Sequence, residues 1–264
     1  MGGRRTIHLY TTSWNEIRML GFFFRHYDPF VDRYVFFDDN SNDGTPEVLS
    51  AHPRVEVRRF ERSDPHSFVE SARRFYDQVW KRSRGEADWV ILTAVDEHLH
   101  HPDFASYLDR MKRAGVTAIP AIGYEMVSEA FPAPDAHLAT TLTRGAPDPQ
   151  WNKLNLFDPN ALKLTRYAPG RHTANPTGRV VYPPADELLL LHYKHLGIEY
   201  LHPRHRLLAT GLRDGDRGRG WGHQFDYTRE QLVQKMRAIE VRAIDIADPD
   251  ERPIERNVGN RWWH

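Results

Sequence analysis

The stretch WVILTAVDEHLHHP, residues 89–102, joins an apolar run directly to a cluster of acidic and histidine side chains. Its first four residues have the length and β-favouring composition of a strand that is covered on both faces. Such a strand delivers Asp96 and Glu97 to its carboxyl end, outside which ligands bind in open α/β sheets. Two carboxylates about 4 Å apart repel each other by roughly 4 kcal/mol at an effective dielectric constant of about 20. A bound cation offsets this repulsion, so we predict a metal site with Asp96 and Glu97 as candidate ligands.

A plainer alternative for this stretch is that the two carboxylates cap the following turn while the nearby histidines lie in solvent. The position at a strand end favours the metal site over this alternative. Because successive residues of a strand point to opposite faces, Asp96 and Glu97 can both bind metal directly only if the chain turns there. We expect one carboxylate to bind the metal and the other to lie behind it. We expect His98, His100 and His101 to be loop residues.

The composition excludes several classes of protein. The chain of 264 residues has 36 basic and 36 acidic residues, which argues against a nucleic-acid-binding protein that relies on bulk positive charge. It has no cysteine, so thiolate zinc sites, disulfides and cysteine nucleophiles are excluded. Neither a signal-peptide core nor an apolar run of membrane-spanning length occurs. We therefore expect a soluble, cytoplasmic protein with no membrane span.

The first half of the chain shows alternating strand and helix signals, which predict a parallel sheet with right-handed crossovers. After residue 123 the regular alternation stops, and we expect a mixed half that is rich in loops. The main expected strands span residues 6–11, 34–37, 55–59, 89–92, 116–122 and 188–193, and the main expected helices span residues 14–26, 67–83, 104–114, 200–212 and 228–246.

Two polar loops follow the first two expected strands, and they open onto the same edge of the sheet as residues 89–102. The second loop lies in the stretch FFDDNSNDGT, residues 36–45, and consists of residues that favour turns. A carboxylate in this crevice can accept a hydrogen bond from a nucleobase N–H or a ribose hydroxyl, and Trp14 offers a face for stacking. The alternative is a turn rich in Asp and Asn that binds no ligand.

These motifs, taken in order, resemble the nucleotide-binding half of family 2-type glycosyltransferases with the GT-A fold. Three later stretches, WNKLNLFDPN at 151–160, GRHTANPTG at 170–178 and LLLLHYKHLG at 188–197, are similar to the downstream half of the bacterial branch of that family. The resemblance implies an α/β fold, a three-layer α/β/α sandwich with a mostly parallel central sheet. It also implies a nucleotide-sugar-binding half at 1–123 and an acceptor-binding half at 124–264, which we expect to form one continuous domain.

The activity implied by the resemblance is transfer of a sugar from a nucleoside diphosphate sugar, usually UDP-linked, to a small-molecule or saccharide acceptor. The family resemblance further implies inversion at the sugar and a divalent metal, Mn²⁺ or Mg²⁺, on the diphosphate. Asp39 matches the residue expected to contact the base, and Asp38 is its neighbour near the ribose. Thr11, Thr12 and Trp14 match positions that line the nucleotide.

The resemblance assigns the metal site to the end of the 89–102 stretch. Asp96 and Glu97 match the last positions of the acidic motif, whereas its first acidic position falls on Ala94. His192 matches a later histidine that completes the metal site, and an imidazole ligand favours Mn²⁺ over Mg²⁺. The alternative for His192 is a histidine at a strand end that bonds only to backbone. Lys194 is placed to meet the diphosphate.

The catalytic base is the least defined part of the predicted site. Such a base takes the proton of the acceptor hydroxyl, while a metal acts as a Lewis acid on the leaving diphosphate. No residue clearly matches the Asp or Glu base of the family. We consider Glu129 and His172 the first candidates and Glu125 and Asp158 the next, although each of them fits a purely structural position equally well.

Two other classes of function remain open. One is a metal-dependent nucleotidyltransferase or hydrolase, which needs a phosphate-activating lysine or water-activating ligands near Asp96. The other is a non-catalytic sugar-nucleotide-binding protein, for which Ala94 in the acidic motif is the sign of a lost activity.

Overall fold

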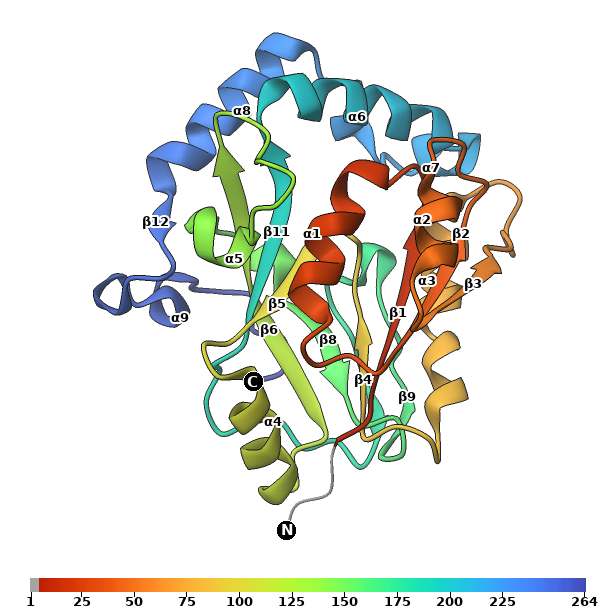
Figure 1. Ribbon diagram of the computed structural model, residues 1–264, viewed down its shortest axis with the longest axis vertical. Coiled ribbons are helices and arrows are strands. Elements are labelled where there is room, and N and C mark those ends of the chain that lie inside the picture. Colours follow the sequence, from red (N-terminus) through yellow and green to blue (C-terminus); the bar gives the residue numbers. More distant parts are fainter. Residues whose placement is uncertain (1–4) are drawn as a thin grey trace.

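The computed structural model describes residues 5–264 and has one large mixed sheet at its centre (Figure 1). The first half of the chain alternates strands and helices, as the sequence predicts. Its elements are β1 (Ile7–Ser13), α1 (Ile17–Tyr27), β2 (Arg33–Asp38), α2 (Thr45–Ala51), β3 (Val55–Arg59), α3 (Phe68–Tyr76), the 3₁₀ turn η1 (Val79–Ser83), β4 (Trp89–Leu92), β5 (Glu97–His100) and α4 (Phe104–Arg113).

The second half begins with a long strand and ends in helices and short turns. Its strands are β6 (Ala118–Ser128), β7 (Arg144–Pro147), β8 (Lys153–Phe157), β9 (Leu162–Leu164), β10 (Thr177–Gly178), β11 (Leu189–Leu196) and β12 (Ile244–Asp245). Its helices are α5 (Leu138–Thr141), α6 (Ile198–Gly211), α7 (Asp214–Gly218), α8 (Arg229–Arg242) and α9 (Pro253–Arg256). The 3₁₀ turns are η2 (Pro149–Trp151), η3 (Pro169–Arg171), η4 (His223–Asp226) and η5 (Pro249–Glu251).

The strand pairing confirms the expected α/β class. β3, β2, β1 and β4 lie side by side in that order and are parallel. β8 pairs antiparallel with both β4 and β6, and so it joins strands of the two halves of the chain into one sheet. β11 lies parallel to β6 and antiparallel to β5. Helices therefore flank a central sheet that is built around four parallel strands.

Two hydrophobic cores lie on the two faces of the sheet, and β4 contributes to both. Trp89 and Ile91 belong to the core that contains residues of α1 and α4. Val90 and Leu92 belong to the core that contains residues of α3 and η1. All four side chains are fully buried. This is the double-sided burial that their sequence predicts, because successive side chains of a strand point to opposite faces.

The starts of the helices agree with the sequence in one case and differ in another. The helix expected from residue 67 begins there, since the Ser67 hydroxyl caps α3 by accepting a hydrogen bond of 3.0 Å from the Glu70 backbone N–H. α1, in contrast, begins at Ile17 rather than at residue 14, because β1 continues as far as Ser13.

The structure corrects the expected position of His98. Like His100, it lies in β5 rather than in the expected loop, and it is fully buried because β11 covers this strand. Its ring stacks on that of His26, with 4.5 Å between the ring centroids. Neither ring nitrogen of His98 has a hydrogen-bond partner in the described part of the chain. Burial holds the pKa of His98 well below its ordinary value, so the ring is neutral.

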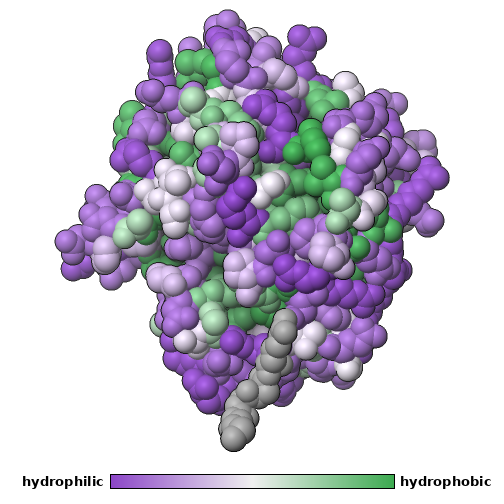
Figure 2. Space-filling view, viewed as in Figure 1, coloured by the Kyte–Doolittle hydropathy of each residue, from purple (hydrophilic) through white to green (hydrophobic). Residues whose placement is uncertain are grey.

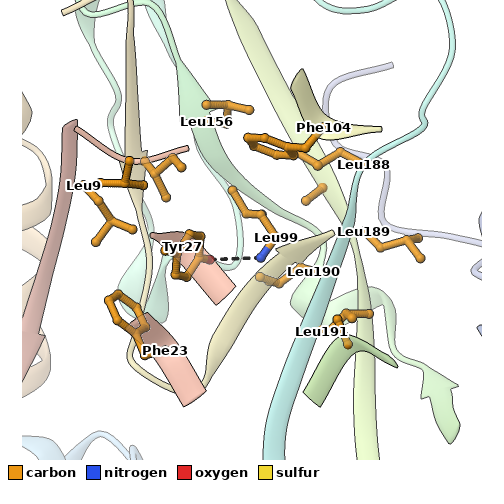
Figure 3. Packing of buried hydrophobic residues seen from close by; sticks show 14 of the residues in the cluster. Leu9, Phe23, Tyr27, Leu99, Phe104, Leu156, Leu188, Leu189, Leu190 and Leu191 are labelled. Atoms are coloured by element: carbon orange, nitrogen blue, oxygen red, sulfur yellow. Dashed lines mark hydrogen bonds between the residues drawn. The ribbon is translucent and has the colours of Figure 1, made fainter. Parts of the chain in front are cut away.

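The side chain of Tyr27 connects α1 to β5 inside the first core. Its hydroxyl donates to the backbone oxygen of Glu97 at 2.8 Å and accepts from the backbone N–H of Leu99 at 2.9 Å. Figure 3 shows this second bond among the packed leucine side chains of β5 and β11. The bond pair fixes the beginning of β5, and with it the turn that carries Asp96.

α6 and α8 lie across the carboxyl ends of the central strands, at the top of Figure 1. Arg204 of α6 donates to the backbone oxygens of Trp14 and Asn15, both at 2.9 Å, and forms an ion pair with Glu16. These contacts tie α6 to the loop that follows β1. α6 therefore forms a roof over the edge of the sheet where the functional residues are predicted.

Asp216 of α7 makes a second connection between this roof and the first half of the chain. The fully buried carboxylate accepts hydrogen bonds from the Ser67 hydroxyl at 2.6 Å and from the backbone N–H of Phe68 at 2.9 Å and of Val69 at 3.2 Å. It thus caps the beginning of α3 from a distant part of the sequence. Composition alone predicts only a loop for residues 214–222.

Polar residues cover most of the face shown in Figure 2, and the apolar patches on it gather near its middle. No helix within residues 5–264 has both the length and the apolar character that a membrane-crossing helix requires.

We expect Tyr27→Phe to destabilise the fold by about 1–3 kcal/mol, because the buried N–H of Leu99 loses its acceptor while the ring packing is kept. Urea denaturation followed by circular dichroism measures the change. Tyr227→Phe is the matched control, because this half-buried tyrosine just after η4 makes no side-chain hydrogen bond to residues 5–264. It should leave stability within about 0.5 kcal/mol of the wild type. Equal stability of both variants and the wild type would contradict the role assigned to the Tyr27 hydroxyl.

We also expect acid to destabilise the protein through its buried histidines. Burial lowers the pKa of His26 to about 3, against an ordinary value near 6.5. The unfolded chain therefore binds a proton below about pH 6.5 that the folded protein excludes, and stability falls by about 1.4 kcal/mol per pH unit for this group as the pH decreases. Urea unfolding between about pH 5 and pH 7 measures this slope. His26→Gln should reduce the slope by up to about 1.4 kcal/mol per pH unit, the contribution of one proton. An unchanged slope would exclude His26 as its source.

Candidate active site

Two adjoining cavities lie at the carboxyl ends of β1 and β4, beneath α6. We call the one of about 320 Å³ the main cavity and the one of about 150 Å³ the side cavity. A third cavity, of about 420 Å³, opens near the amino end of β1 and is lined by none of the predicted functional residues. The main and side cavities share a wall made of Thr12, Glu16, Phe68, Ala94, Arg204, Leu208 and Phe225.

The side cavity combines an indole ring with a buried ion pair. Asp39, at the end of β2, accepts a hydrogen bond of 2.6 Å from Arg62 Nη2, and both residues line the cavity. Arg62 Nη1 is buried and has no hydrogen-bond partner within residues 5–264. The ring of Trp14 packs on α6, where a methyl group at Gly211 would come within 2.8 Å of it. The cavity thus presents a flat apolar wall, a carboxylate and an unused N–H donor.

The other three predicted nucleotide-binding residues of the first half have different surroundings. Thr12 lines both cavities. Thr11 is fully buried, and its hydroxyl donates to the backbone oxygen of Thr12 at 3.1 Å. Asp38 accepts bonds from the backbone N–H and the hydroxyl of Ser41, at 2.9 and 2.6 Å, and so it orders the turn after β2. Neither Thr11 nor Asp38 is among the residues that line the two cavities.

Asp96 and His192 meet at the wall of the main cavity. The antiparallel pairing of β11 with β5 sets His192 opposite Glu97, and the backbone N–H of Tyr193 donates to the backbone oxygen of Asp96 at 2.7 Å. This pairing brings His192 Nε2 within 3.3 Å of Asp96 Oδ2. Burial by itself favours the neutral acid, but the adjacent imidazole holds the pKa of Asp96 below its ordinary value.

Glu97 lies at the centre of a buried ion cluster. We call this group, made of Glu97, Lys153 and Arg171, the Glu97 cluster. Lys153 Nζ donates to Oε1 at 2.6 Å, Arg171 Nη2 donates to Oε2 at 2.9 Å, and the backbone N–H of Ala94 also donates to Oε2, at 3.0 Å. Burial by itself favours the neutral acid, but the two cations hold the pKa of Glu97 well below its ordinary value. Both carboxylate oxygens are engaged, and they order the turn that carries Asp96.

The three predicted metal ligands therefore separate into a pair and a single residue. Asp96 and His192 face each other, whereas the carboxylate of Glu97 faces two cations. In the part of the chain that the structure describes, no three Asp, Glu or His side chains converge as a metal site. A metal ion at this position would rely on Asp96 and His192 together with oxygens of its ligand.

Lys194 follows on β11 and lines the main cavity. Its ammonium group has no ion-pair partner within 4.0 Å among residues 5–264, and it lies 5.0 Å from the centre of the Phe225 ring. Burial and the nearby charge of Lys235 lower its pKa to about 8. A largely buried ammonium without a partner favours binding of an anion, because burial of an isolated charge is costly.

His172 is the one of the four candidate bases that lines the main cavity. Its Nδ1 lies 2.7 Å from the backbone oxygen of Gln150, and since a carbonyl oxygen only accepts, Nδ1 carries the proton. Burial, with the charge of Lys153, lowers the pKa of His172 to about 4, so the ring is neutral near neutral pH. Nε2 then keeps a free lone pair.

The other candidate bases lie elsewhere. Glu129 is exposed beyond the end of β6. Glu125 is buried on β6, with its carboxylate 3.8 Å from the Lys235 ammonium, and Asp158 is buried after β8, 3.7 Å from that of Lys112. None of these three carboxylates is among the residues that line the main or the side cavity.

The C-terminal tail supports the wall of the main cavity. Asn152 Nδ2 donates to Asn257 Oδ1 at 3.2 Å, and Trp262 Nε1 donates to the backbone oxygen of Asn152 at 3.0 Å. Asn152 directly follows Trp151, whose ring centroid lies 3.9 Å from that of His192. The tail therefore holds in place the aromatic ring that packs on a predicted metal ligand. Nothing in its sequence pattern indicates this role.

Sequence reasoning also missed Arg62, Lys153 and Arg171. The sequence does hold a signal that could have identified Lys153 as a paired or functional residue, because it is a charged residue within the apolar strand pattern of β8. Arg171 stands between Gly170 and a candidate base, which marks a special turn but not an ion pair. Arg62 lies in an irregular segment whose local pattern gives no signal.

No protein-family model matches the sequence. No curated protein matches it either.

Solved structures give weak likenesses. They include a mycobacterial protein (22% identity, TM-score 0.32, covering 46% of this chain and 41% of that chain) and residues 1–349 of S. aureus TarS (10%, 0.41, 78% and 64%). A third is 4-diphosphocytidyl-2C-methyl-D-erythritol synthase, with 17% identity, a TM-score of 0.33, and coverage of 61% of this chain and 78% of that one. This chain thus spans less than two thirds of the length of the mycobacterial protein and of the TarS fragment. At these TM-scores the likenesses carry no argument about function.

We expect Trp262→Phe to cost about 0.5–1.5 kcal/mol of stability more than the same change of ring size at a tryptophan without a hydrogen bond, because the bond to the Asn152 carbonyl is lost. Urea denaturation measures the loss. Trp221→Phe is the matched control, since the indole N–H of Trp221 makes no hydrogen bond to residues 5–264. If the two variants lose the same stability, the bond from the tail does not hold the Trp151 segment.

Proposed function

We propose that this protein is a glycosyltransferase that moves a sugar from a nucleoside diphosphate sugar, UDP-linked, to a hydroxyl group of a small-molecule or saccharide acceptor. One observation carries the proposal: the unpaired ammonium of Lys194 lies in the same cavity as the adjoining donors Asp96 and His192. A diphosphate group can bind both a metal ion held by Asp96 and His192 and the unpaired ammonium of Lys194. The resemblance of the motifs supports the same conclusion.

The nucleoside lies in the side cavity in this proposal. The indole of Trp14 stacks on the base, and the Asp39 carboxylate accepts a hydrogen bond from a base N–H. Arg62 Nη1, which has no partner in the described part of the chain, donates to a base carbonyl. The shared wall at Thr12 and Ala94 then leads the diphosphate into the main cavity.

The residues present fit a divalent metal through Asp96 and His192. A carboxylate oxygen and an imidazole nitrogen 3.3 Å apart on one cavity wall can face the same ion, and this donor set suits Mn²⁺. Bound there, a divalent metal supplies Lewis-acid stabilisation of the leaving diphosphate. Glu97 has a different role in this proposal: with its oxygens held by two cations, it keeps Asp96 in position.

The transfer itself is a single displacement with inversion. The acceptor oxygen forms the new bond to the anomeric carbon as the bond to the diphosphate breaks. His172 is the base we assign, because its Nδ1–H is fixed on the Gln150 carbonyl and Nε2 keeps the lone pair that accepts the hydroxyl proton. The Lys194 ammonium lies in the same cavity and stabilises the negative charge that the diphosphate gains.

A second candidate function is a sugar-nucleotide-binding protein without catalysis. Two observations favour it: Ala94 stands at the first acidic position of the motif, and Glu97 is separated from the other two predicted metal donors by its pairing with two cations. The two functions differ in turnover: the enzyme releases free UDP from a UDP-sugar in the presence of acceptors, and the binding protein does not.

We expect UDP to stabilise the wild-type protein more strongly with Mn²⁺ than with a chelator present, in a thermal-shift assay against several nucleoside diphosphates. Asp96→Ala should abolish the part that depends on Mn²⁺, because one of the two adjacent donors is lost. Glu47→Ala, on the exposed side of α2, is the control and should behave like the wild type. Full Mn²⁺ dependence in Asp96→Ala would overturn the metal assignment. If none of the nucleoside diphosphates stabilises the wild-type protein, the proposed function is wrong.

A further inference from the structure

The main cavity has one group of wall residues that the side cavity lacks, contributed by residues 151–172. Trp151, Lys153, Arg171 and His172 line only the main cavity. If the nucleoside occupies the side cavity, these residues surround the part of the substrates farthest from the base. They therefore face the transferred sugar or the acceptor rather than the nucleoside.

The Glu97 cluster has more positive than negative charge. Lys153 and Arg171 share the single carboxylate of Glu97, and their side chains are only 3% and 6% exposed. The structure gives the Lys153 ammonium one hydrogen-bond acceptor, Glu97 Oε1, for its three N–H donors. The Lys153 ammonium also lies 4.2 Å from the centre of the Trp151 ring. The cluster thus keeps one positive charge beyond its single carboxylate, and unused N–H donors, in a cavity wall.

The other two carboxylates that line the main cavity each have a different direct partner. Asp96 lies against His192, and Glu16 pairs with Arg204. Lys194 and Arg73 add positive charge, and Arg73 is matched outside the cavity by carboxylates on and just after α3. A buried excess charge is costly unless a ligand of the opposite sign neutralises it.

The backbone around Arg171 is also unusual. Arg171 has φ of 61° and its neighbour Gly170 has φ of 69°, so a residue with a side chain adopts the left-handed conformation. Such strain persists where the surrounding structure holds it, often at a binding site. Here the guanidinium is held by the backbone oxygen of Leu92 at 2.8 Å and packs over the ring of Tyr76 at 4.5 Å. The strained turn therefore holds the Arg171 guanidinium in one position in the wall of the main cavity.

We propose that Lys153 and Arg171 form an anion subsite in the main cavity, which binds a carboxylate or phosphate group carried by the acceptor or by the transferred sugar. The chemical class of the ligand follows from the excess charge of the cluster, and only the choice of the molecule that carries the anion rests on the proposed function. Glu97 sets the strength of this subsite, because it neutralises one of the two cations.

The wild-type protein tests the proposal first. Thermal shifts are measured with glucuronate and with inorganic phosphate, each against glucose as the neutral probe, in the presence of UDP. UDP-glucuronate against UDP-glucose tests whether the anion belongs to the donor sugar. We expect at least one acidic probe to stabilise the protein more than its neutral counterpart. If every acidic probe gives the same thermal shift as its neutral counterpart, the anion subsite is wrong.

Two variants of nearly equal size change the charge of the cluster in opposite directions. Lys153→Gln removes the excess positive charge and should weaken binding of the acidic probe by about tenfold or more. Glu97→Gln increases the excess charge and should tighten it. A purely structural cluster predicts instead that both variants weaken binding equally. If either variant fails to fold, the comparison of acidic and neutral probes on the wild type decides alone.

The two proposals fail in different ways. Loss of all UDP binding with retained binding of phosphate or glucuronate rejects the proposed function and keeps the anion subsite. Normal UDP binding and turnover with no preference for acidic probes rejects the subsite and keeps the function.

Discussion

The buried carboxylate of Glu97 is the interaction on which the candidate site depends. It joins β5 to Lys153 of β8 and to Arg171 of η3, which lie far from it in the sequence. Burial of a lone carboxylate is costly, so Glu97 needs at least one of these two cations in the interior. The same carboxylate also accepts the backbone N–H of Ala94 and so shapes the turn before Asp96. One ion cluster therefore sets the geometry of the turn and the charge of the cavity wall.

The path of β11 explains how the second half of the chain completes the site. It runs between β5 and β6, antiparallel to the first and parallel to the second. This arrangement carries His192 and Lys194 to the edge where β4 ends. α6 begins two residues after β11 and returns over the same edge, where Arg204 binds the loop after β1. The cavity is thus closed by the element that directly follows the strand supplying its donors.

Much of the fold could be read from the pattern of apolar residues, since alternating strands and helices of ordinary length leave few alternatives. The position of a residue at this edge of the sheet was predictable where it follows a strand within a few residues, as for Asp39 and Asp96, because parallel strands end at one edge. Arg62 and the C-terminal tail escaped prediction, since their partners lie in other segments. His98 was misplaced because its polar character indicates a loop, whereas pairing with β11 buries it as a neutral ring.

By itself, the sequence determined the α/β class and the buried strand that precedes Asp96 and Glu97. Local periodicity and the chemistry of side chains at strand ends are sufficient for this, because both are properties of neighbouring residues. Only the tertiary structure decided that Asp96 meets His192 while Glu97 binds two cations. That choice depends on which distant segments supply opposite charge at each oxygen, and charges separated along the chain come together only when the sheet is assembled.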